Sequence, residues 1–140
     1  MNIPPFNGPA LEFWRAREWP KKFLLYEGDG SPLELGASDV VRARIWDGGD
    51  ESAPLVSMTS ASATANGSTI TVDALGDEDG AADADCAQIT ILVDATDAAL
   101  VPVDASGVVT YLEITVARAA ASTKEYPVHR CVLKVKGSPG

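Results

Sequence analysis

The clearest strand signal in the chain is the stretch VVTYLEITVA at positions 108–117. Four of its apolar residues fall in step along one face: Val108, Leu112, Ile114 and Val116. A period of two is the pattern of a β-strand that covers a core with one side and meets water with the other. The stretch therefore predicts a half-buried strand.

Six more apolar or alternating runs, divided by turn residues, lie before and after it: 19–26, 40–46, 55–60, 68–73, 87–93 and 128–135. Short strands at such spacing are typical of an all-β sandwich or barrel. Seven strands over about 120 residues predict an immunoglobulin-like sandwich of two antiparallel sheets. Tyr111 either supplies the tyrosine-corner hydrogen bond of such folds or packs as an ordinary tyrosine, and the sequence leaves both readings open.

Two connections carry local signals of their own. Asn66-Gly67 predicts a two-residue hairpin turn that leads into the strand at 68–73, because both positions tolerate positive φ. Residues 94–100 (DATDAAL) predict one helical turn that crosses the end of the sandwich. Asp94 is its candidate N-cap, Asp97 suits the positive helix end, and Leu100 is expected to plug the core.

The first eighteen residues depart from the strand pattern, so we divide the chain into an extended arm (1–18), the sandwich (19–137) and a tail (138–140). Pro9 is placed to begin a short helix that ends near Glu18. The arm either folds back over its own sandwich or inserts into a groove on a partner. Large aromatic residues anchor interfaces. In the second case the anchors would be Phe6, Phe13, Trp14 and Trp19.

The net charge of −9 is unevenly distributed, since residues 47–104 hold twelve acidic and no basic residues. This balance argues against nucleic-acid binding and against attraction to anionic lipid. The basic residues cluster toward both ends of the chain, among them Arg15, Arg17, Lys21, Lys22, Arg42, Arg44, Lys134 and Lys136. They either form a face that docks an acidic partner or another copy, or they only keep the protein soluble.

Groups suited to catalysis are scarce, so we expect no enzyme, no cofactor and no metal. The single histidine, His129, has no neighbouring nucleophile motif, and with Cys86 and Cys131 it falls short of a zinc set. We expect both cysteines to be free thiols. The acidic stretch 76–85 offers calcium-type ligands, but its spacing is not that of an EF-hand and predicts a solvated loop.

The order of segments resembles the N-terminal, immunoglobulin-like domain of phage baseplate upper proteins. The stretch FLLYEGDGSPLELGASDVVRARIW (23–46) is similar to that family's opening strand, turn and second strand, with the strand motif at 41–45. The matching turn residues are Asp29, Gly30, Pro32 and Leu35. AQITILVDATDAAL (87–100), GVVTYLEITVA (107–117) and VHRCVLKVKG (128–137) resemble later family segments. The likeness spans about residues 19–137 and concerns the scaffold.

The resemblance implies a structural component of a tailed-phage virion, assembled in the host cytoplasm. Its partners would be other phage structural proteins and copies of itself, in the tail, baseplate or fibre-attachment region. A capsid decoration protein on the phage head is one alternative. A carbohydrate-binding sandwich is another, with Trp46 and Tyr126 as its candidate aromatics. No apolar run is long enough to span a membrane, and no signal peptide is expected at the start.

Overall fold

The computed structural model describes residues 8–27, 30–48, 51–76, 86–103, 109–118 and 125–137. Within these ranges the chain forms eight strands and one short helix. The elements are β1 (Leu11–Trp14), β2 (Trp19–Leu24), β3 (Val40–Asp47), β4 (Val56–Thr59), β5 (Thr69–Ala74), β6 (Gln88–Val93), α1 (Ala95–Ala98), β7 (Thr110–Ala117) and β8 (Glu125–Lys136). All seven strands expected from the sequence are present, with bounds that differ by a few residues.

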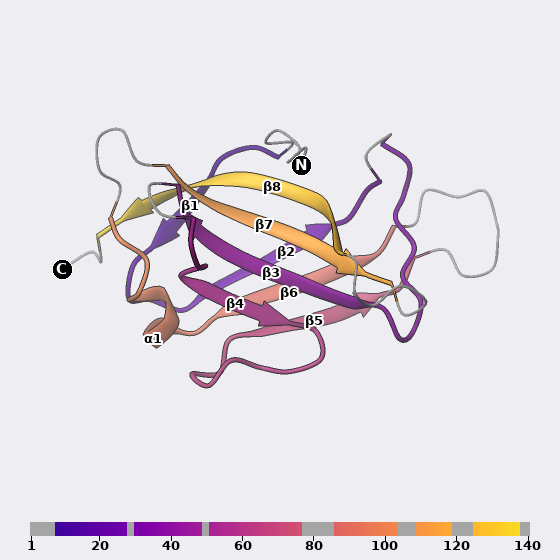
Figure 1. Ribbon diagram of the computed structural model, residues 1–140, viewed down its shortest axis with the longest axis horizontal. Helices are drawn as coiled ribbons and strands as arrows, with labels where there is room; N and C mark the ends of the chain where they lie inside the picture. The colour runs from indigo at the N-terminus through magenta and orange to yellow at the C-terminus, as the bar shows by residue number, and fades with distance from the viewer. Residues whose placement is uncertain are drawn as a thin grey trace.

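The strands form two sheets. The larger has the order β1-β8-β7-β3-β4 and the smaller the order β2-β6-β5. Figure 1 shows the smaller sheet behind the larger one, and one hydrophobic cluster contains residues from both. Among the described pairings only β1 with β8 is parallel. The chain is therefore a mostly β protein of two sheets around a shared core, compatible with a β-sandwich.

Alternation along each strand explains which residues build that core. On β3 the side chains of Val41, Ala43 and Ile45 are fully buried, whereas those of Arg42 and Arg44 are partly exposed. Each buried Val or Ile contributes roughly 1.5–3 kcal/mol relative to an exposed one. Strand β3, which was expected from the alternating run at 40–46, therefore has one buried face and one partly exposed face.

The predicted helix after Pro9 is wrong, because residues 11–14 form strand β1 instead. Its pairing with β8 runs in register from Leu11 opposite Leu133 to Trp14 opposite Lys136. A helix of about ten residues is marginal by itself. The edge of β8 offers hydrogen bonds and Phe13 finds a core position, so tertiary contacts outweigh the local helix signal. The expected boundary at residue 18 thus does not separate an arm from the sheet.

The predicted Asn66-Gly67 hairpin is also wrong, since β4 and β5 belong to different sheets. The turn lies one residue earlier, with the Gly67 amide donating to the Thr64 carbonyl oxygen at 3.0 Å. Gly67 has a φ of +98°, whereas Asn66 does not have positive φ. Gly67 therefore ends the turn in the left-handed region. The Asn66 side chain donates a hydrogen bond to the Asp97 carboxylate.

The helical crossover is confirmed at Ala95–Ala98, where the Asp94 carboxylate caps the N-terminus by accepting from the Thr96 amide. It carries the chain from β6 in the smaller sheet to β7 in the larger one (Figure 1). The expected plug is wrong, because Leu100 is 55% exposed and Val101 is fully buried in its place. The chain turns after the single helical turn, which brings the next residue inward.

Asp97 holds this crossover to the loop before β5. Its carboxylate, only 4% exposed, accepts hydrogen bonds from Thr64 Oγ1 at 2.6 Å, Asn66 Nδ2 at 2.8 Å and Ser68 Oγ at 2.5 Å. Burial by itself raises the pKa of this carboxyl, but the hydrogen bonds from Ser68, Thr64 and Asn66 outweigh burial and lower it. Asp97 lies in the first turn of the helix, as expected, and is in addition a buried structural acid.

We expect Asp97→Asn to lower the free energy of unfolding by about 1–3 kcal/mol, because an amide cannot accept all three hydrogen bonds. The folded-state pKa of Asp97 lies below its ordinary value. Its stabilisation is therefore present above the unfolded-state pKa and is lost as the pH falls through the folded-state pKa. Urea unfolding of the unmodified chain and of Asp97→Asn measures the difference in their free energies of unfolding. This difference should become smaller as the pH is lowered.

The matched control is Asp73→Asn, because Asp73 is exposed and accepts one hydrogen bond, from Thr90 Oγ1. This substitution should change the unfolding free energy little. Equal losses in the two variants would contradict the role assigned to Asp97.

Candidate functional site

The five-stranded sheet has a side that faces away from the core. We call it the outer face. Its central side chains come from β3, β7 and β8: Arg42, Arg44, Trp46, Tyr111, Glu113, Thr115, Arg130, Val132 and Lys134. Register aligns them in rows across the sheet, with Trp46 opposite Tyr111 and Tyr111 opposite Val132. The next row places Glu113 between Arg44 and Arg130.

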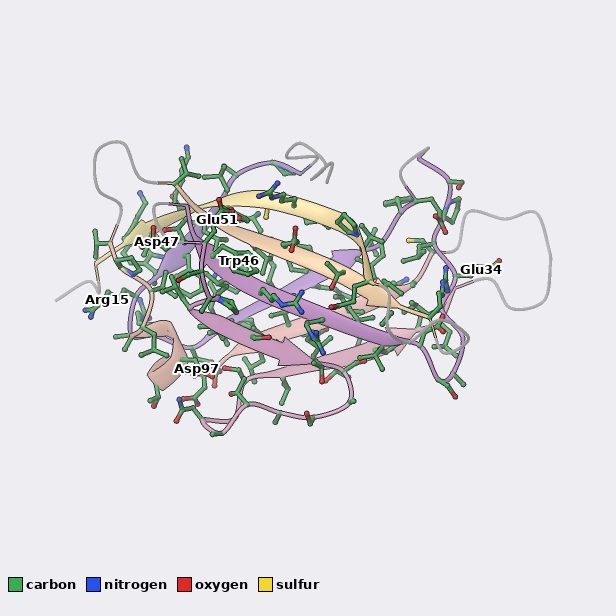
Figure 2. All side chains as sticks on the ribbon, viewed as in Figure 1. Arg15, Glu34, Trp46, Asp47, Glu51 and Asp97 are labelled. Atoms are coloured by element: carbon green, nitrogen blue, oxygen red, sulfur yellow. The ribbon has the colours of Figure 1, made fainter. Side chains whose placement is uncertain are left out.

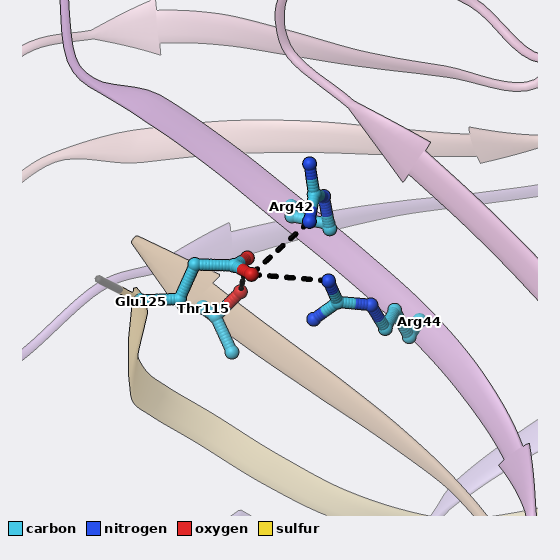
Figure 3. A network of polar contacts seen from close by, with 4 residues as sticks. All are labelled: Arg42, Arg44, Thr115 and Glu125. Carbon is cyan, nitrogen blue, oxygen red and sulfur yellow. Dashed lines mark hydrogen bonds and ion pairs between the residues drawn. The ribbon is translucent and has the colours of Figure 1, made fainter. Parts of the chain in front are cut away.

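Two arginines and one glutamate form the first cluster on this face. Glu125 Oε2 lies 3.1 Å from Arg42 Nη1 and 3.1 Å from Arg44 Nη2. Thr115 Oγ1 donates to Glu125 Oε1 at 2.9 Å. Figure 3 shows both guanidinium groups on β3 reaching toward the carboxylate at the start of β8. We call these four residues the arginine cluster.

Within the arginine cluster two guanidinium groups share one carboxylate, and Glu113 places a second carboxylate opposite Arg44 on the neighbouring strand. Burial alone raises the pKa of Glu125, but the hydrogen bonds from Arg44 and Thr115 and the charges of both arginines lower it overall. The Arg42 side chain is 36% exposed and that of Arg44 is 19% exposed. Arg44 is thus held in place, while Arg42 keeps donor groups in contact with water.

The second cluster surrounds Tyr111. The guanidinium of Arg130 lies 4.2 Å from the centre of the Tyr111 ring, and the Tyr111 hydroxyl donates to the Glu51 carboxylate. Glu51 also lies 3.9 Å from Arg130. A tyrosine corner runs to backbone a few residues upstream, whereas this hydrogen bond reaches a side chain 60 residues upstream. Burial and the Glu51 carboxylate raise the pKa of Tyr111 to about 12, so it remains a hydrogen-bond donor.

Trp46 lies beside this second cluster, as Figure 2 shows with Trp46, Asp47 and Glu51 grouped at one end of β3. The Trp46 side chain is partly exposed, and it lies on the outer face near the end of β3. An indole partly open to water next to fixed arginines is the composition of an interface core. The outer face therefore presents a partly exposed indole among charged side chains of both signs.

The structure separates the predicted aromatic anchors. Phe13 is fully buried and Trp19 is 7% exposed, with their ring centres 5.1 Å apart, and the Trp19 indole N–H donates to the Glu12 carbonyl oxygen. Both therefore serve this chain's own core while β1 stays on β8. Trp14 is partly exposed, and Phe6 lies outside the described residues. Within residues 8–18 the arm folds back onto its own chain, because β1 pairs with β8.

The remaining candidate groups are in structural positions. His129 packs edge-on against Phe23 with ring centres 5.1 Å apart, and burial lowers its pKa, which favours the neutral imidazole. Cys86 and Cys131 are free and buried, so the expectation of unpaired thiols is confirmed. Burial raises the pKa of Cys131 to about 11, so the thiol stays protonated and is a poor nucleophile.

No three His, Cys, Asp or Glu side chains gather in a metal-binding group within the described ranges. The acidic stretch considered for calcium falls at 77–85, outside those ranges. The helix found in the described part of the chain is too short to cross a bilayer.

Sequence reasoning identified Arg42 and Arg44 as exposed basic residues but missed their partner. Glu125 lies 83 and 81 residues away along the chain, and no local pattern links it to β3. The pairing of β3 with β7 and of β7 with β8 brings the three side chains together. Comparison with known proteins found no family model and no curated protein that matches this chain.

We expect the Glu125 carboxyl to titrate below the ordinary pKa of a glutamate, and Arg44→Ala to raise that pKa more than Arg42→Ala does. Arg44 is the less exposed of the two and donates the hydrogen bond that lowers the pKa most. NMR titration of the side-chain carboxyl carbon measures the pKa in all three proteins. An ordinary value in the unmodified chain, or the reverse order of the variants, would contradict the geometry of the arginine cluster.

Proposed function

We propose that this chain is a non-enzymatic docking module with an immunoglobulin-like sandwich, a structural component of a tailed-phage virion. It binds a neighbouring virion protein through the outer face of its five-stranded sheet. The observation that carries the docking role is the arginine cluster beside Trp46, on a face built from the centre of the larger sheet.

The strand order supports the immunoglobulin-like part of the proposal. Immunoglobulin sandwiches place strands B, E and D in one sheet and C, F and G in the other. If β2 is matched to B and the later strands follow in order, β2-β6-β5 corresponds to B-E-D. The run β8-β7-β3 then corresponds to G-F-C, with β4 added next to C. The first strand is placed differently, since β1 lies beside the last strand.

The virion setting rests on the resemblance of residues 19–137 to the first domain of baseplate upper proteins. The segments that carry this resemblance are structural in this chain. The motif VRARI forms β3, whose outward arginines belong to the arginine cluster, and Leu35 of the turn motif is buried in the core. The likeness concerns the scaffold, and in this chain that scaffold holds Arg42 and Arg44 on the outward side of β3.

Charge and residue type define the partner of the outer face. Tryptophan and arginine are among the residues most enriched at positions that dominate binding energy, and Trp46 and Arg42 are partly exposed, whereas Tyr111 is buried. Arg42 is the more exposed of the two arginines that share Glu125, so a partner carboxylate would complete its hydrogen bonding. We therefore expect an acidic patch on the partner protein, and binding that weakens as salt increases.

The test is incorporation into particles. We expect the double variant Arg42→Glu and Arg44→Glu to be incorporated at least about tenfold less than the unmodified chain, because like charges across an interface cost several kcal/mol. Quantitative mass spectrometry of purified particles measures the copy number. A matched control is the double variant Lys21→Glu and Lys22→Glu on β2, which makes the same charge change on the smaller sheet.

Circular dichroism and thermal melting should show that both double variants remain folded. Equal incorporation of the two variants would contradict docking through the outer face. Absence of the unmodified chain from particles would contradict the virion role as a whole. Copy number also locates the protein, because a head decoration protein is far more abundant per particle than a tail component.

A further inference from the structure

We propose that β1 exchanges between two copies of this chain, so that β1 of each molecule packs on β8 of the other. The contacts in question join residues 11–14 to β8 and to Trp19. This inference goes beyond docking through the outer face and does not depend on it. In the exchanged dimer each β1 stays joined to its own chain but pairs with β8 of the other chain. The two copies are therefore held together without a covalent bond between them.

The contacts that hold β1 are self-contained. They include the four register pairs with β8, the insertion of Phe13 into the core against Trp19, and the hydrogen bond from the Trp19 indole to the Glu12 carbonyl oxygen. The Gly8 and Arg15 amides on either side of β1 also donate to β8 carbonyl oxygens, at 3.2 and 3.0 Å. An ion pair between Glu12 Oε1 and Lys136 Nζ at 3.5 Å adds to them. An identical β1 from a second molecule would make every one of these contacts, so exchange sacrifices none of them.

The connection between β1 and β2 is short and strained. Ala16 has a φ of +64° and is the single non-glycine residue with positive φ in the described ranges. The hydrogen bond that closes the turn, from the Arg17 amide to the Trp14 carbonyl oxygen, is long at 3.4 Å. Two arginines, Arg15 and Arg17, flank the strained residue. A short hinge under strain favours exchange, because an extended hinge lets alanine return to an ordinary conformation.

The position of β1 makes its release feasible. It is an edge strand of four residues, and its pairing is the parallel one among otherwise antiparallel described pairings. Parallel pairing is slightly less stable per residue than antiparallel pairing. Release exposes the edge of β8 and the space that Phe13 fills. The occupant that fits both at once, with Glu12 brought beside Lys134 and Lys136, is another β1.

The arm was expected either to fold back over its own sandwich or to insert into a groove on a partner. Exchange of β1 includes both arrangements. In the closed monomer Phe13 covers the core of its own chain, as the structure shows. In the exchanged pair the same side chain anchors a neighbouring copy in the same environment. The groove on the partner is then the vacated β1 site of an identical molecule.

The test uses the register between Glu12 and Lys134, which are exposed neighbours on β1 and β8. Adjacent strands lie about 4.8 Å apart, within the range that a disulfide spans. Glu12→Cys and Lys134→Cys are purified as separate single variants, one of them isotopically labelled, and are mixed at high concentration with a mild oxidant. We expect a disulfide-linked dimer on a non-reducing gel. The mass of this dimer should show that it contains one labelled and one unlabelled chain.

Two controls accompany this mixture. Glu12→Cys mixed with Ser57→Cys, an exposed position on β4 at the far edge of the same sheet, should give little mixed dimer. Both substitutions in one chain should form an intrachain disulfide, which shows that the register is right. The proposal is overturned if the double variant closes within one chain while the mixed single variants give no more dimer than the Ser57→Cys control.

The hinge supplies an independent measurement. Ala16→Gly removes the strain of a positive φ, so we expect it to reduce the yield of mixed dimer by at least about threefold at equal protein concentration. Arg17→Gly, one residue away at ordinary φ, is the matched control and should not reduce the yield. An unchanged yield in Ala16→Gly would show that strain at this residue does not drive exchange.

Discussion

Alternation of inward and outward side chains along β3 is the constraint on which the rest of the molecule depends. Ala43 faces the core opposite Ile114, and the neighbouring Arg42 and Arg44 face water for the same geometric reason. A slip of one residue in register would turn both arginines into the core. Core packing and the layout of the outer face are therefore one property of the register, and any docking role of that face depends on a well-formed interior.

The ends of the two sheets are closed by different physical means. At one end the Asp97 carboxylate, with its three hydrogen bonds, ties the crossover helix to the loop before β5. Along one side β1 completes the larger sheet and brings Phe13 against Trp19. The first closure is a buried polar network that depends on every partner. The second is an apolar contact on an edge strand, which an identical strand can replace.

The arginine cluster and the β1 contacts use different residues, although both belong to the five-stranded sheet. The arginine cluster is formed by β3, β7 and the first residue of β8, whereas β1 pairs with the last residues of β8. In the exchanged dimer each copy keeps its own arginine cluster, so the dimer carries two such clusters. Two linked copies would bind a repetitive partner more tightly than one copy, because the second contact forms at a high effective concentration.

The sequence by itself determined the strands, the crossover turn with its Asp94 cap, and the free state of the two cysteines. The strands and the crossover turn follow from side-chain periodicity and local hydrogen bonding within a few residues, and the free thiols follow from the small number of cysteines. Only the tertiary structure decided that residues 11–14 form a strand, that the turn near Asn66 joins two different sheets, and that Glu125 binds Arg42 and Arg44. The reason is sequence separation: these outcomes depend on contacts between residues tens of positions apart, which no local pattern encodes.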